Sequence, residues 1–139
     1  MHIRTSVSVI IDRPPAEVFA RLTDFKTWPQ WGGGNLVSIE PMSPGPLQVG
    51  SQLRQVNKTG RKPTETLVQV THWVPDHTLG IEGPNPRSMF TLEPAEIGTR
   101  LNVSGEVEAT GLSALMYRLF LKQFVVSDLR KFKALVEAS

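Results

Sequence analysis

The chain has 139 residues, 40% of them hydrophobic and 20% charged, which is ordinary for a globular protein and fits a single domain over residues 1–139. The formal net charge is only +2 and no run of like charges occurs, so no nucleic-acid partner is expected. The absence of cysteine excludes disulfides, a thiolate nucleophile and zinc–thiolate sites.

The N-terminal part of the sequence predicts one strand followed by two short helices. Residues 3–12 alternate β-branched and polar side chains, which is typical of a strand with one face on the core. Asp12 and the prolines after it mark the start of a helix whose apolar stripe ends near Leu22. Residues 24–31 predict a second short helix or turn, and three glycines follow it.

The middle of the chain predicts six strands separated by turns rich in proline and glycine. Short connections between consecutive strands favour antiparallel neighbours, so we expect a meander. The strands are expected at residues 36–40, 51–58, 64–74, 78–82, 88–94 and 99–109.

Residues 112–138 contain neither glycine nor proline and predict one long helix. The apolar stripe of its second half is displaced by roughly a third of a turn from that of its first half. Such a helix contacts two different surfaces or curves around a sheet. The predicted fold class is α+β: a strongly curved antiparallel sheet of about seven strands around a long C-terminal helix, with two short helices between the first two strands.

Several segments carry a family resemblance. Residues 9–31, VIIDRPPAEVFARLTDFKTWPQW, are similar to the N-terminal pattern of the SRPBCC superfamily, which joins START-like lipid-transfer domains with the polyketide cyclase/dehydrase group. Residues 48–51, 70–75 and 98–101 resemble its later landmarks. The resemblance implies the helix-grip fold and an apolar cavity between the sheet and the last helix. Members hold lipids, quinones, hormones or aromatic polyketides there, and some catalyse cyclisation or dehydration.

The residues expected to line this cavity lie on the predicted inner faces of strands, on the last helix and at the tryptophan corner, which is the segment of Trp28 and Trp31. Three groups have an alternative interpretation. The two tryptophans are alternatively interpreted as plugging the joint between helices and sheet, and His72 as a polar residue at a strand end. The alternative for the helix residues is that they belong to the core, a partner chain or a membrane surface. The predicted pocket residues are Trp28, Trp31, Val68, Val70, His72, Phe90, Leu92, Leu101, Val103, Met116, Phe120 and Phe124.

No catalytic constellation is evident in the sequence. The three histidines are dispersed, so we expect no metal and no other cofactor. The glycines of residues 32–34 lead into a strand rather than a helix, which excludes a phosphate loop. The polar candidates for acid–base chemistry are Arg54, Glu65, His72, Arg100 and Tyr117, and we expect Arg54 and Glu65 to form a surface ion pair instead.

Three functions therefore remain open. The first is binding of a hydrophobic small molecule, such as a lipid, a quinone or an aromatic polyketide-like compound. The second is a cyclase or dehydratase that uses the same cavity, and the third is a regulatory protein-interaction module.

A homodimer is compatible with the apolar helix. We find neither a signal peptide nor about 18 consecutive apolar residues, so we expect no transmembrane segment and a cytoplasmic location.

Overall fold

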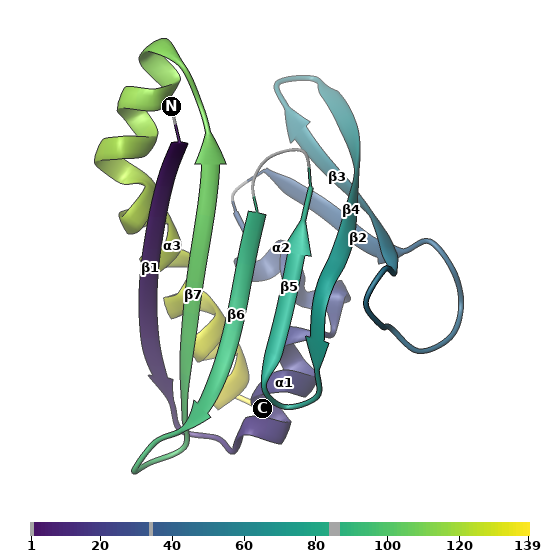
Figure 1. Cartoon of the computed structure of the whole chain (residues 1–139), viewed down its shortest axis with the longest axis vertical. Helices are drawn as coiled ribbons and strands as arrows, with labels where there is room; N and C mark the ends of the chain where they lie inside the picture. Colours follow the sequence, from purple (N-terminus) through teal and green to yellow (C-terminus); the bar gives the residue numbers. More distant parts are fainter. Residues whose placement is uncertain (1, 34, 84–86) are drawn as a thin grey trace.

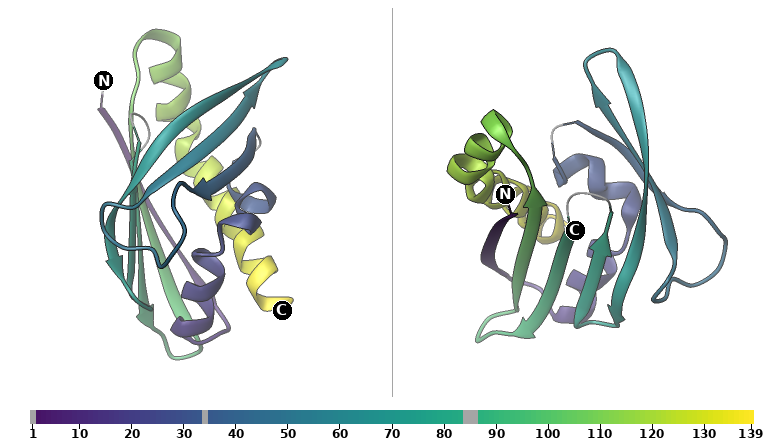
Figure 2. Two further views of the ribbon diagram at one scale, coloured as in Figure 1. Left: turned by 90° about the vertical axis from the view of Figure 1, so that its right-hand side faces the viewer. Right: turned by 45° about the horizontal axis from the view of Figure 1, so that its top comes forward.

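In a computed structural model, which describes residues 2–33, 35–83 and 87–139, a seven-stranded antiparallel sheet curves around the C-terminal helix (Figure 1). The strand order is β1-β7-β6-β5-β4-β3-β2. The helices all lie on the concave side of this sheet (Figure 2). The elements are β1 (His2–Ile11), α1 (Pro15–Leu22), the 3₁₀ turn η1 (Phe25–Thr27), α2 (Trp28–Trp31), β2 (Leu36–Pro41), β3 (Gln52–Thr59), β4 (Lys62–Val74), β5 (Thr78–Glu82), β6 (Arg87–Pro94), β7 (Thr99–Glu108) and α3 (Gly111–Glu137).

The period-two pattern of the sequence sets which side chains face the helices. Along β7 the residues Leu101, Val103 and Val107 are buried on the inner face, whereas the alternate residues Asn102, Ser104 and Glu106 point to the convex face. β1 pairs with β7 in continuous register from His2–Glu108 to Ile11–Thr99, so the first strand lies beside the last. This pairing places β1 under α3.

The short helices attach to the sheet through an aromatic cluster. The indole N–H of Trp28 donates to the carbonyl of Leu22 at 2.8 Å, which ties α2 to the end of α1. Trp31 is 4% exposed, and its ring centroid lies 4.8 Å from that of Phe132 on α3. Phe90 on β6 contacts both tryptophan rings. The tryptophan corner therefore joins α1, α3 and the sheet.

The two halves of α3 have different surroundings. Leu129, Phe132 and Val136 are buried in the main core, whereas Ala114 is the one buried side chain in the first half. In Figure 2 the first half, drawn in green, runs past the ends of β1 and β7. None of the helices in the described ranges is long and apolar enough to cross a membrane.

The predicted element order, the antiparallel meander and the α+β helix-grip architecture are confirmed. Arg54 forms the expected ion pair with Glu65 at 3.3 Å, and a second one with Glu40 at 3.2 Å, all three being exposed. Neither contact is near the concave face.

The expected orientation of His72 is wrong because β4 contains an irregularity that the sequence pattern does not reveal. The register with β5 shifts between Val70 and His72, so the inward alternation continues at Trp73 instead. Trp73 packs edge-on against Phe19 of α1 with 5.3 Å between ring centroids. His72 is exposed on the convex face.

The turn between β6 and β7 packs against residues 11–13, at the end of β1, and substitution of Gly98 tests this packing. The φ of Gly98 is +74°, and a Cβ there would lie 2.0 Å from the carbonyl oxygen of Ile11. Gly60 has φ +69° with nothing within 4 Å of a Cβ, so it is the matched control. We expect Gly60→Ala to cost about 1–2 kcal/mol from the left-handed backbone alone. Gly98→Ala adds the steric clash and should cost more than about 3 kcal/mol in urea unfolding; equal costs would contradict this packing.

Candidate ligand-binding site

Two adjoining hollows lie between the concave face of the sheet and α3. The inner one has a volume of about 440 Å³ and reaches the tryptophan corner. The outer one, of about 600 Å³, lies between α3 and the strands β1, β6 and β7. The two hollows are neighbours, because both are lined by Gly33, Asn35, Ser88, Tyr117, Val125 and Asp128.

The floor of the inner hollow is apolar and aromatic. Trp28, Trp31 and Phe90 form it together with Val68 and Val103 from the neighbouring strands. The indole N–H of Trp31 is buried and has no hydrogen-bond acceptor among the described residues. A buried donor without an acceptor is unusual in a native structure and is commonly satisfied by a water or a ligand.

One wall of the inner hollow is a row of amides. Gln55 Nε2 donates to Asn57 Oδ1 at 2.8 Å, and Asn57 Nδ2 donates to Asn35 Oδ1 at 3.3 Å. Gln55 and Asn57 alternate along β3 with outward-facing residues, which explains why both reach the concave face. These amides supply donors and acceptors opposite the aromatic floor.

Asp128 of α3 is the carboxylate of the site, and it lines both hollows. Burial raises the pKa of the Asp128 carboxyl, and the hydrogen bond from the Gly33 backbone N–H and the charge of Lys131 offset this only in part. The Tyr117 side chain and Ser88 line the same wall. The site thus combines an apolar floor with a carboxyl group that holds its proton more tightly than an ordinary aspartate.

The outer hollow owes part of its space to a glycine. Gly105 follows Leu101 and Val103 on the inner face of β7, and a Cβ at this position would meet only Arg87 O and Thr5 Cγ2, both at 3.9 Å. Leu121 and Phe124 close the opposite side from α3.

The structure divides the predicted pocket residues into three groups. Those lining a hollow are Trp28, Trp31, Val68, Phe90, Val103 and Phe124. Those buried in the core away from both hollows are Val70, Leu92 and Leu101. Those exposed to solvent are His72, which the β4 irregularity turns outward, and Met116 and Phe120, which lie on the side of α3 that faces away from the sheet.

Sequence reasoning missed most of the polar wall: Asn35, Gln55, Asn57, Ser88 and Asp128. Asp128 had a detectable signal. It follows Leu121 by seven residues and Val125 by three, so it interrupts the stripe of α3 that faces the sheet. A charged residue in such a stripe is a candidate functional group.

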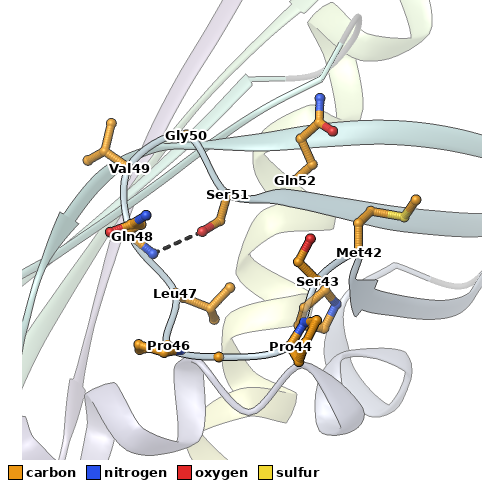
Figure 3. A pocket seen from close by; sticks show the side chains of 12 residues that line it. Met42, Ser43, Pro44, Pro46, Leu47, Gln48, Val49, Gly50, Ser51 and Gln52 are labelled. Carbon is orange, nitrogen blue, oxygen red and sulfur yellow. Dashed lines mark hydrogen bonds between the residues drawn. The ribbon is translucent and has the colours of Figure 1, made fainter.

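Another hollow, of about 390 Å³, lies within the loop of residues 41–52 between β2 and β3 (Figure 3). All of its lining belongs to this one loop, whose turn is held by a 3.0 Å hydrogen bond from the Gln48 N–H to Ser51 Oγ. It contains no titratable side chain and is remote from the concave face, so it is the inside of a turn rather than a site. Within the described ranges, no three His, Asp or Glu side chains are close enough to hold a metal ion.

A curved antiparallel sheet that grips a C-terminal helix, with a hollow between them, defines the START-like helix-grip class. Residues 2–137 match the family described as polyketide cyclase / dehydrase and lipid transport. The chain belongs to this family, as the resemblance in the sequence implied. No curated protein sequence matches the chain.

Solved structures of the same fold are similar along the whole chain. Ara h 8.0201 superimposes with a TM-score of 0.75 at 15% identity, covering 100% of both chains. Protein NE0264 from Nitrosomonas europaea gives 0.77 at 12% identity, covering 98% of this chain and 95% of that one. The di-domain ARO/CYC BexL from the BE-7585A biosynthetic pathway gives 0.69 at 13% identity, covering 99% of this chain and 49% of that one. At these identities the similarity establishes the fold alone.

The raised pKa of Asp128 has a measurable effect on stability. The folded state binds this proton more tightly than the unfolded state does, so the free energy of unfolding falls as the pH rises from the ordinary Asp pKa through the raised one, and then levels off. Asp128→Asn retains an acceptor for Gly33 but cannot ionise. We therefore expect the stability of wild type relative to Asp128→Asn to decrease as the pH rises above about 4, the ordinary pKa of an aspartate, in urea titrations. A pH-independent difference would contradict the burial of this carboxyl.

Proposed function

We propose that the protein binds one hydrophobic small molecule, of the lipid, quinone or aromatic polyketide-like kind, in the two adjoining hollows between the sheet and α3. The observation that carries this proposal is the pairing of an aromatic floor, Trp28, Trp31 and Phe90, with a confined set of polar groups opposite it. Ligand sites are typically apolar cavities with a few placed polar groups that fix orientation. The family's description, which includes lipid transport, agrees with this class of ligand.

The polar groups favour a ligand that has an oxygen-bearing end or rim. The amide row provides donors for a carbonyl or hydroxyl oxygen. Asp128 accepts a hydrogen bond from a hydroxyl when ionised and donates one to a carbonyl when protonated. A pure hydrocarbon would leave these groups unpaired, which costs free energy on binding.

Asp128 also supports the alternative that the cavity is the active site of a cyclase or dehydratase. A half-buried carboxyl with a raised pKa is suited to accept a proton from carbon next to a carbonyl and return it to a departing hydroxyl. His72, Arg54 and Arg100 have no part in this alternative, since all three are exposed. If the protein is an enzyme, Asp128→Asn should abolish turnover while leaving ligand binding largely intact.

Filling the outer hollow tests the proposed binding site. Gly105→Phe would place a ring in open space on the inner face, whereas Ser104→Phe puts the same ring on the convex face one residue earlier. We expect Gly105→Phe to weaken binding of the neutral fluorophore N-phenyl-1-naphthylamine by at least about tenfold, because the ring replaces buried ligand surface. Ser104→Phe should bind as wild type does. Equal binding by both variants would place the ligand elsewhere.

The natural ligand is sought by extracting the purified protein with organic solvent and analysing the extract by mass spectrometry. The proposal expects one hydrophobic compound in near-stoichiometric amount, absent from extracts of Gly105→Phe. A compound retained equally by both proteins would contradict the assignment of the cavity.

A further inference from the structure

The first half of α3 exposes an unusually large set of apolar side chains. We define the outer face of α3 as Leu112, Leu115, Met116, Leu119, Phe120 and Phe124, whose exposed fractions run from 42% to 74%. At 100° per residue these side chains cover roughly half of the helix circumference, opposite the buried Ala114. Single exposed apolar residues are common, but a contiguous apolar face of this kind indicates an interaction site.

Along residues 111–127, which carry the outer face, both charges are positive. Residues 111–127 contain Arg118 and Lys122 and no Asp or Glu. Both cations are exposed and lie next to Leu115 on one border of the face, and neither forms an ion pair with any residue that the structure describes. Glu106, at the adjoining end of β7, is paired with His2 and Arg4 on the opposite side of the sheet.

This charge pattern discriminates between occupants. A second copy of the chain would meet the face by two-fold symmetry, so that Arg118 and Lys122 of each copy would approach the same cations without an acid between them. An anionic lipid surface instead complements them, since long basic side chains at the border of an apolar helix face reach phosphate groups while their stems stay on the apolar surface.

We propose that the outer face of α3 docks on anionic lipid membranes, with Leu119, Met116 and Phe120 entering the headgroup–acyl boundary. The helix lies in the plane of the surface and does not cross it. Arg118 and Lys122 contact lipid phosphates at its border. This surface shares only Phe124 with the lining of the outer hollow, and its docking does not depend on whether the cavity holds a ligand.

The docked position has a geometric consequence for the cavity. Phe124 belongs to the outer face and also lines the outer hollow, together with Tyr117 and Leu121. The apolar face therefore continues into the mouth of the hollow, so docking brings this mouth to the lipid surface. A hydrophobic ligand would pass between membrane and cavity with little exposure to water; this consequence rests on the proposed ligand-binding function.

The test is co-sedimentation of the full chain with vesicles of phosphatidylcholine, alone or with about 30 mol% phosphatidylserine, at about 0.1 M and about 0.5 M salt. We expect binding to the anionic vesicles at the lower salt, and at least about tenfold weaker binding to the neutral ones. Failure to bind the anionic vesicles at low salt would overturn the proposal.

Two variants probe the apolar and the basic parts separately. Leu119→Asp should reduce vesicle binding by at least about tenfold. Ile97 is an apolar residue of similar exposure in the β6–β7 turn, and Ile97→Asp should leave binding unchanged. The double variant Arg118→Ala/Lys122→Ala should lose roughly 30-fold on anionic vesicles. Circular dichroism confirms that each variant is folded, as expected for exposed positions.

Sedimentation velocity tests the alternative that a second copy of the chain, and not a membrane, covers the outer face. A dimer that Leu119→Asp dissociates, in a protein that does not bind vesicles, would assign the outer face to a second copy and overturn the lipid proposal. Gly105→Phe should bind vesicles as wild type does. Loss of cavity binding with vesicle binding retained would leave docking standing alone, whereas the reverse result would refute docking and leave the cavity proposal intact.

Discussion

The packing of Trp31 between α3 and the sheet fixes the geometry on which the site depends. Its ring lies 4.8 Å from that of Phe132 and 6.4 Å from that of Phe90, and Trp28 packs behind it with its N–H bonded to Leu22. This cluster sets the distance between the second half of α3 and the sheet. The hollow begins where the aromatic rings end, because the rings hold the helix away from β3 and β4 without filling the space toward Gly33.

The two halves of α3 differ in how far they are buried, and so in what they contribute to the fold. The second half is anchored by Leu129, Phe132 and Val136 in the core, which stabilises the fold. The first half buries only Ala114, so folding gives no reason for its apolar residues. Exposed apolar area of this extent costs solubility and favours association. A second requirement on the sequence, beyond stability of the isolated chain, explains why such residues stand there.

The sequence predicted the elements and most strand faces, because the period-two pattern of β7 and β1 persists without interruption. It failed for His72, since one extra residue in β4 reverses the inner face and leaves no mark in the pattern. The displaced stripes of α3 predicted a helix that contacts two different surfaces or curves around the sheet, but not which half faces solvent. The position of Asp128 in the inward stripe of α3 could have been read from the sequence, but its contact with Gly33, almost a hundred residues away, could not.

The contact between Gly33 and Asp128 gives the glycines at residues 32 and 33 a role in the site. Gly33 has φ +86°, and a Cβ on Gly32 would approach the carbonyl of Trp28 to 3.0 Å, so each glycine meets a separate backbone requirement. The Gly33 N–H then faces the Asp128 carboxylate across the common wall of the two hollows. An asparagine would accept the same hydrogen bond without the cost of burying a charge. A carboxyl that lowers stability at neutral pH, placed where both hollows meet, is not explained by what it does for the fold, and the proposed ligand would give it a role.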